Sequence, residues 1–204
     1  MLMGYSEKSL FFPGKPLYRN LEINPSQLLR TRETPTAMLT LPTKIRRKKQ
    51  PYIAIRSRLS RRQLERQAIV FLTELRSYMV TNAFDVIGPA YFRFNAFEDN
   101  GEADMEFGFF TDKQYTVPYP MRSGLLPGGT FTTVTWQGEY SRLDDVNLVL
   151  LGWGAINKIA WEDAKIDGAG FEGCRLAIFH KTPRIEPNAE NLLTELAILH
   201  KTAA

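Results

Sequence analysis

Glu106 is the side chain of this sequence best placed to do chemistry. In the segment 104–111, Met105 and Phe107 alternate with Glu106 and Gly108, so the acid and the large apolar residues lie on opposite faces of an expected strand. A carboxylate among aromatic residues attracts a cation and can act as a general acid or base. If helices cover the Met105/Phe107 face, Glu106 looks into a cleft on the other face; the alternative is an ordinary structural glutamate.

Flat aromatic side chains are the second group of candidates. They bind planar, apolar or cationic ligands by stacking and cation–π contact, each worth about 0.5–2 kcal/mol. Half or more of the aromatic residues are expected in the core, and the candidates for the walls of a binding cleft are Tyr91, Phe92, Trp136, Tyr140, Trp153 and Phe179. The Tyr140 hydroxyl could bind a ligand or, with Glu106, serve catalysis; the alternative is a turn tyrosine that caps a helix.

Other chemistries find little support in the sequence. His180 and His200 are the only histidines, and both are expected to be structural or surface residues. Cys174 is the only cysteine, which excludes an internal disulfide and any site with several cysteine ligands. The turn 127–129 lacks the Lys-Ser/Thr of a phosphate-binding loop. We therefore expect no metal and no cofactor.

The elements that position these residues follow from hydrophobic periodicity and turn residues. The first half predicts a strand near 52–58, a helix over 61–80 that begins after Ser60, a strand over 90–97, a hairpin loop at 98–102 and a strand over 104–111. After a short extended segment at 121–126, the second half predicts a strand over 130–137, a helix over 142–161, a strand over 174–180 and a strand over 192–199.

The order strand–helix–strand–strand therefore occurs twice, about 75 residues apart, although the two copies barely match in sequence. Such a duplication predicts an α+β fold: β-α-β-β units related by a pseudo-twofold axis form an antiparallel sheet with two long helices on one face. The ligand cleft is expected between the halves, on the concave or split opposite face.

Four segments of this body resemble the GyrI-like small-molecule-binding domains. Segments 126–130 (LPGGT) and 134–143 (VTWQGEYSRL) are similar to the family's LPGG and GpYxxL signature, 105–109 (MEFGF) to its LEVGFPV strand, and 194–196 (TEL) to its closing TEI strand. Trp153 sits where the family tends to carry an aromatic residue. The resemblance spans about 51–203 and implies the SHS2-type duplicated fold.

The resemblance implies three possible functions. The first is a binding module like the effector-binding domains of multidrug-sensing transcriptional activators, which holds a small, partly aromatic or cationic molecule as a stand-alone sensor or sequestering protein. The second is a hydrolase of cyclopropane-containing or similar strained genotoxic compounds, with Glu106 as acid/base and Tyr140 and Trp136 positioning the substrate. The third is a protein that interacts with DNA gyrase or a transcription factor.

One position departs from the family. Its multidrug-binding members commonly carry a glutamate two residues before the aromatic of the 174–180 strand, whereas this chain has Ala177 before Phe179. The resemblance therefore implies weaker recognition of cations and permits a neutral ligand.

Residues 1–50 differ from the rest of the chain. They carry ten Lys/Arg and three Asp/Glu, a net charge of +7, whereas residues 51–204 carry sixteen and nineteen, a net charge of −3. We expect a flexible, proline-containing extension whose basic run (Lys44, Arg46, Arg47, Lys48, Lys49) binds nucleic acid weakly at most, followed by one domain over 51–203. The absence of a long apolar run predicts a cytoplasmic protein without membrane spans.

Overall fold

The computed structural model describes residues 37–97, 102–162 and 173–201. The predicted hairpin loop at 98–102 and the loop before residue 174 fall almost wholly outside this range. The strands are β1 (Met38–Leu39), β2 (Thr43–Arg47), β3 (Gln50–Ser60), β4 (Val86–Phe97), β5 (Glu102–Thr111), β6 (Met121–Leu126), β7 (Gly129–Gln137), β8 (Arg175–Lys181) and β9 (Leu193–Leu199). The helices are α1 (Arg61–Thr81) and α2 (Leu143–Ile156), with short 3-10 turns η2 (Tyr140–Arg142) and η3 (Ala189–Asn191).

The predicted duplication is confirmed. Units β3-α1-β4-β5 and β7-α2-β8-β9 lie side by side in one antiparallel sheet of order β1-β7-β9-β8-β4-β5-β3-β6, with β2 also paired to β7. The halves meet where β4 pairs with β8, and Phe92 is opposite Ala177 in that register. Each half contributes its three strands in mirrored order about this seam.

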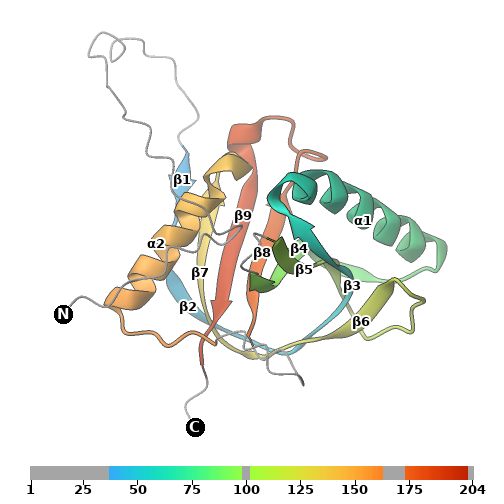
Figure 1. Ribbon diagram of the computed structural model, residues 1–204, viewed down its shortest axis with the longest axis horizontal. Coiled ribbons are helices and arrows are strands. Elements are labelled where there is room, and N and C mark those ends of the chain that lie inside the picture. The colour runs from blue at the N-terminus through green and yellow to red at the C-terminus, as the bar shows by residue number, and fades with distance from the viewer. Residues whose placement is uncertain (1–36, 98–101, 163–172, 202–204) are drawn as a thin grey trace.

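Both helices cover the same face of the sheet, as predicted. Helix α1 packs on β3 and β5, and α2 packs on β7. Figure 1 shows the two helices apart from each other, with β8 and β9 visible between them. Their N-terminal ends are joined by an ion pair in which Arg61 Nη2 donates to Asp144 Oδ2 at 3.2 Å. The strands at the seam are therefore flanked by helices rather than lying beneath one.

Local sequence explains where the helices begin and end. Ser60 is the N-cap of α1, and its backbone N–H and hydroxyl both donate to Gln63 Oε1, at 2.9 and 2.7 Å. Helix α2 ends at Ile156, five residues before the predicted end, because Lys158 adopts a left-handed conformation with a φ of 53°. The chain then turns back, and Trp161 forms a bridge to His200.

The sheet extends before residue 50, where we expected a flexible extension. Strands β1 and β2 pair with β7, so residues 37–50 are part of the folded domain. Only two residues join β2 to β3, and only two join β6 to β7, although β2 and β6 lie at opposite edges of the sheet. The edges therefore come together at this end, and the helix-free face is the inside of a curled sheet (Figure 1).

The interior is divided between the two faces of the sheet. Under the helices, side chains from both halves form one cluster, which includes Leu64, Phe107, Val134, Leu150 and Phe179. Inside the curl, a second cluster fills the concave face and comprises Tyr52, Ala54, Tyr91, Leu126, Phe131, Cys174, Leu176, Ile178, Ala197 and Leu199. The concave face is therefore packed with the chain's own residues where we expected an open cleft. No helix in the described part of the chain is long and apolar enough to cross a membrane.

Candidate functional site

Aromatic side chains from both halves meet on the helix-bearing face at the seam. Phe92 of β4 contacts Phe179 of β8 with ring centroids 4.5 Å apart and Phe107 of β5 at 4.8 Å. Phe71 of α1 contacts Phe107 at 5.5 Å, and Tyr140 of η2 contacts Phe179 at 5.4 Å. We call these five residues the aromatic cluster. Its rings meet edge-on or tilted, the arrangements aromatic pairs prefer.

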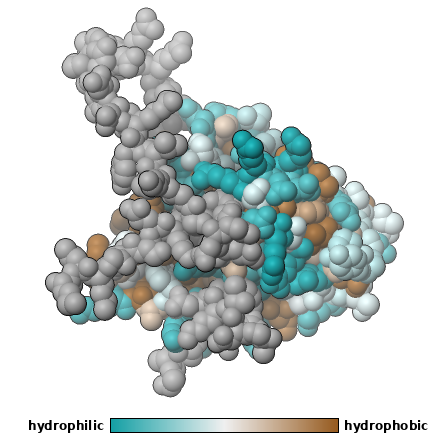
Figure 2. Space-filling view, viewed as in Figure 1, coloured by the Kyte–Doolittle hydropathy of each residue, from teal (hydrophilic) through white to brown (hydrophobic). Residues whose placement is uncertain are grey.

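The aromatic cluster is partly open to solvent. Phe107 and Phe179 are buried, whereas Phe71 and Phe92 are half-buried and Tyr140 is 36% exposed. Hydrophobic atoms reach the surface at several places among hydrophilic ones in the view of Figure 2. A ligand could therefore reach these rings without unfolding the core.

Trp136 and Tyr140 are positioned by the turn between them. Gly138 has a φ of 149°, a conformation that side-chain-bearing residues rarely adopt, and a Cβ there would collide with the Trp136 ring. The indole Nε1–H of Trp136 donates to the Glu139 carbonyl at 3.0 Å, which folds the ring over this turn. Burial raises the pKa of Tyr140 to about 12, so its hydroxyl stays protonated at neutral pH and can donate a hydrogen bond.

Two fully buried polar side chains lie on the helix-bearing side of the sheet, one on β9 and one on α2. Thr194 of β9 lies opposite Trp136 on one side and Phe179 on the other, and it is fully buried. Asn147 of α2 is also fully buried. Within the described residues, neither the Thr194 hydroxyl nor the Asn147 amide oxygen and nitrogen have a hydrogen-bond partner. Buried polar groups are normally paired, so these three unpaired atoms call for an explanation.

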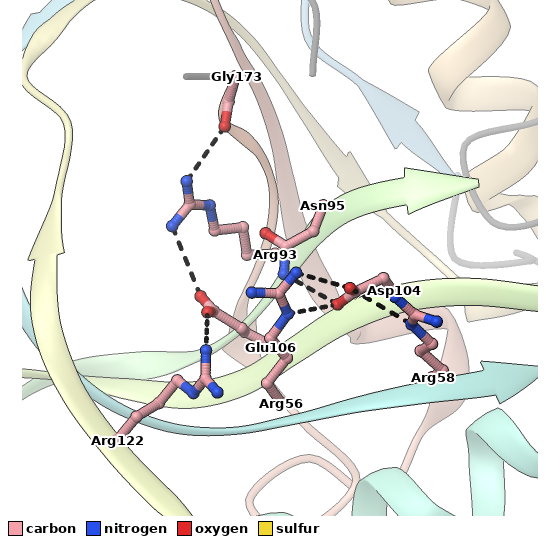
Figure 3. A network of polar contacts seen from close by, with 8 residues as sticks. All are labelled: Arg56, Arg58, Arg93, Asn95, Asp104, Glu106, Arg122 and Gly173. Atoms are coloured by element: carbon pink, nitrogen blue, oxygen red, sulfur yellow. Dashed lines mark hydrogen bonds and ion pairs between the residues drawn. The ribbon is translucent and has the colours of Figure 1, made fainter. Parts of the chain in front are cut away.

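Glu106 lies on the opposite face of the sheet, inside the curl. Its carboxylate is 3.5 Å from Arg93 Nη1 and 3.7 Å from Arg122 Nη1, and Arg93 also donates to the Gly173 carbonyl at 3.1 Å (Figure 3). Glu106 and Arg93 are buried. Two guanidinium groups thus balance the charge of this carboxylate.

A second carboxylate on this face is held in the same way. Arg56 donates to both oxygens of Asp104 at 2.6 Å, Asn95 donates to Asp104 at 3.3 Å, and Arg58 is 3.8 Å away (Figure 3). Burial would raise the pKa of Asp104, but the hydrogen bonds from Arg56 and Asn95 outweigh it and lower the pKa. This network fastens β3, β4 and β5 together.

The tyrosines and cysteine of the concave face are held in their neutral forms. Burial and the Glu106 carboxylate raise the pKa of Tyr91 and of Tyr52. Burial raises the pKa of Cys174 to about 12, so its thiol is a poor nucleophile at neutral pH. This packed face therefore combines ion pairs with buried polar atoms that make no hydrogen bond within the described residues, the Tyr91 hydroxyl and Glu106 Oε2.

The structure separates the residues that the sequence analysis proposed for one site. Phe92, Phe179 and Tyr140 meet in the aromatic cluster, and Trp136 packs beside it. Glu106 and Tyr91 lie on the other face of the sheet, so the expected meeting of the carboxylate with these four aromatic side chains is wrong.

Trp153 lies away from the aromatic cluster. Asp144 marks the side of α2 that faces α1, because it pairs with Arg61. Trp153 follows nine residues later, about two and a half turns along, and so projects from the opposite side of the helix. Its predicted place in the ligand site therefore lacks support in the fold.

Histidines and basic residues fall into two groups. His180 contacts Glu195 at 3.1 Å and His200 contacts Thr132 at 2.7 Å, which fits the predicted structural roles. In the basic run, Lys44, Arg46, Lys48 and Lys49 are exposed, whereas Arg47 pairs with Glu195. The described residues contain no cluster of three or more metal-ligating side chains.

Sequence reasoning missed Phe71, Thr194 and Asn147. Phe71 and Thr194 looked like ordinary members of a helix stripe and a strand. Asn147 carried a usable signal, because it is a polar residue within the apolar stripe formed by Leu143, Val146 and Leu150.

Solved structures share this fold at low sequence identity. The C-terminal domain of EcmrR matches with a TM-score of 0.62 and 13% identity over 82% of this chain and 98% of that domain. EcmrR in a complex with DNA matches with a TM-score of 0.65 and 11% identity over 82% of this chain, which spans 58% of that chain's length. SAV2435 bound to tetraphenylphosphonium matches with a TM-score of 0.55 and 9% identity over 79% of this chain and 94% of that chain.

Comparison by sequence found no match, either to a protein-family model or to a curated protein. Identities of 9–13% establish a common fold and leave the site residues to be argued from this chain. The duplicated units and the two helices on one face are those that the sequence pattern predicted, and the duplication is also what the resemblance implied. The chain therefore has the fold of a GyrI-like small-molecule-binding domain.

Proposed function

We propose that this protein binds a small, planar, aromatic molecule at the aromatic cluster, between α1 and α2. The observation that carries the proposal is the junction of rings from both halves at the seam, with Phe71, Phe92 and Tyr140 reaching solvent. Each stacked or edge-on ring adds about 0.5–1.5 kcal/mol beyond the burial of its surface. A few such contacts, with the burial of apolar surface that accompanies them, support binding below about 1 mM without any charged group.

The ligand can be neutral or a diffuse cation. Ala177, which lies on the helix-bearing face opposite Phe92 and Leu196, leaves this position without a carboxylate. SAV2435, which shares the fold, binds tetraphenylphosphonium, a cation whose charge is covered by phenyl rings. The faces of the rings in the aromatic cluster attract such a cation. However, none of the five side chains of the aromatic cluster carries a negative charge, which favours a neutral planar molecule.

Binding of this kind suits a sensor or a sequestering protein. This chain matches the EcmrR C-terminal domain over nearly all of that domain. We therefore propose an effector-binding role in the context of transcription regulation. An interaction with DNA gyrase or with a transcription factor is implied only by the resemblance to GyrI-like domains, and it stays a prediction.

A hydrolase in which Glu106 and Tyr140 share one substrate is not favoured by the geometry. Glu106 lies inside the curl between Arg93 and Arg122, whereas Tyr140 lies on the helix-bearing face. A substrate on the aromatic cluster would be separated from the carboxylate by the sheet itself.

Titration with tetraphenylphosphonium and with the neutral bicycle 2-quinolinone, followed by calorimetry and tryptophan fluorescence, tests the proposal. At least one probe should bind with a dissociation constant below 1 mM, a threshold of about −4 kcal/mol. Tyr140→Ala and Phe179→Leu should each weaken binding about 5- to 20-fold, since each removes one ring contact. Tyr119 is 96% exposed, so Tyr119→Ala is the matched control and should bind as the wild type does. Absence of binding by both probes, or equal weakening in the control, would overturn the proposal.

A further inference from the structure

Asn147 is an unusual polar residue of the interior under the helices. It is fully buried in α2 among Leu143, Val146 and Leu150, and both its amide oxygen and its amide nitrogen have no hydrogen-bond partner in the described structure. Leaving a buried polar atom unpaired is destabilising, because the atom has lost its hydrogen bonds to water and gained none in the protein. A side chain with both a donor and an acceptor unpaired is therefore a costly feature that packing does not explain.

The amide lies on the side of α2 that faces the aromatic cluster. Asp144 is three residues before Asn147 and Leu151 is four residues after it, so the three side chains share one flank of the helix. This flank faces α1, because Asp144 is bonded to Arg61. The aromatic cluster runs from Phe71 of α1 to Tyr140 at the start of α2, and hence lies on this flank.

Thr194 provides a third unpaired group at the floor of the same site. Its register partners are Trp136 on β7 and Phe179 on β8, and side chains opposite each other in adjacent strands lie about 5 Å apart on one face. Its hydroxyl is buried and has no partner in the part of the chain that the structure describes. Polar atoms that lack partners therefore occur on two separate elements of the helix-bearing side, α2 and β9, and the one on β9 lies beside aromatic residues.

We propose that Asn147, helped by Thr194, selects planar heterocycles that carry a hydrogen-bond donor and acceptor side by side, as in a cyclic amide. This inference rests on the proposed function and names its ligand class. A carboxamide presents one donor and one acceptor in a plane, which matches such an edge with two hydrogen bonds. Asparagine reads the edge of adenine by the same complementarity. The rings of the aromatic cluster hold the flat body of the molecule, and the amide recognises its edge.

The test compares 2-quinolinone with N-methyl-2-quinolinone, in which the donor is blocked, by calorimetry on the full chain. The wild type should prefer 2-quinolinone at least tenfold. Asn147→Leu should bring the two dissociation constants within about twofold, and Thr194→Val should reduce the preference partly. Thr135 lies next to Trp136 on the concave face, so Thr135→Val is the matched control and should retain the full preference.

Thermal unfolding of Asn147→Leu provides a readout that does not depend on any ligand. Replacing an unpaired buried amide by an apolar group of similar shape should raise the midpoint by roughly 2–4 °C. A lower midpoint would show that Asn147 makes a stabilising contact, and would overturn the inference.

The outcomes separate the two proposals. If a probe binds at the aromatic cluster but the wild type does not prefer 2-quinolinone tenfold, or Asn147→Leu keeps that preference, the inference is wrong and the proposed function stands. The same holds if tetraphenylphosphonium binds and neither quinolinone does. If no probe binds the wild type, the proposed function fails and the inference fails with it.

Discussion

The negative charge of the buried Glu106 carboxylate is neutralised by arginines inside the curled sheet. Two arginines from strands on either side of β5 approach it, Arg93 from β4 and Arg122 from β6 beyond β3. A buried charge without partners would cost several kcal/mol, whereas a paired one is tolerated. Asp104 with Arg56, and Glu195 with Arg47 and His180, repeat the arrangement. The concave face is therefore built around paired ions.

Cys174 provides a pH prediction at the residue scale. Burial raises the pKa of its thiol from an ordinary value of 9.0 to about 12, so the folded state holds this proton more tightly than the unfolded chain does. The resulting contribution to stability is complete below pH 9 and is lost as the pH rises toward 12, up to about 4 kcal/mol in total.

Urea unfolding of the wild type and of Cys174→Ala between pH 7 and pH 11 would measure this effect. The difference in the free energy of unfolding between the two proteins should be constant up to about pH 8. It should then shrink or change sign as the pH rises, because only the wild type carries the thiol. A constant difference up to pH 11 would contradict the buried placement of Cys174.

At the scale of elements, the start of α1 is held by a local device. The Ser60 N–H and hydroxyl both donate to Gln63 Oε1 one turn later, and Leu64, Ala68, Leu75 and Met79 bury the face that follows. The cap fixes where the helix begins, and the stripe fixes which side meets the sheet.

Ser60→Ala should lower the free energy of unfolding by about 0.5–1 kcal/mol, because the hydroxyl of the cap is lost. Ser77 is an exposed serine in the same helix, so Ser77→Ala is the matched control. It should leave stability unchanged or raise it slightly, since alanine has the higher helix propensity. Chemical denaturation of the two variants measures both effects, and equal destabilisation would argue against the cap.

At the scale of the whole molecule, the sheet depends on strands that precede each repeat. Strand β2 leads into β3 yet pairs with β7 of the other half, and β6 leads into β7 yet pairs with β3. The strand that precedes each repeat therefore pairs with the edge strand of the other repeat. These pairings connect the two halves in addition to the pairing of β4 with β8.

Truncation tests this dependence. A protein lacking residues 1–49 loses β1 and β2, which exposes the edge of β7 and uncovers Phe131. It should unfold at least 5 °C below the full chain or aggregate. A protein lacking only residues 1–36 keeps β1 and β2, so the edge of β7 stays paired. Its thermal unfolding midpoint should therefore lie within about 2 °C of that of the full chain. Equal loss in both truncations would show that β2 is not the stabilising element.

The sequence by itself determined the elements of the two repeats and their order, although it missed β1 and β2 and placed the end of α2 five residues too late. Alternation and turn residues located the strands of both repeats, and the apolar stripe with Ser60 located α1, because these signals act between neighbours along the chain. The period of two along β5 also placed Glu106 and Phe107 on opposite faces, which the structure confirms.

Only the tertiary structure decided which faces are open and which side chains meet. The sheet curls because two-residue links join β2 to β3 and β6 to β7 across its opposite edges. The curl turned the expected cleft into a packed interior and enclosed Glu106 between arginines. The aromatic cluster, Thr194 and Asn147 come from segments far apart in the chain. These side chains meet because distant strands pair with one another, and local patterns in the sequence do not predict which distant strands will pair.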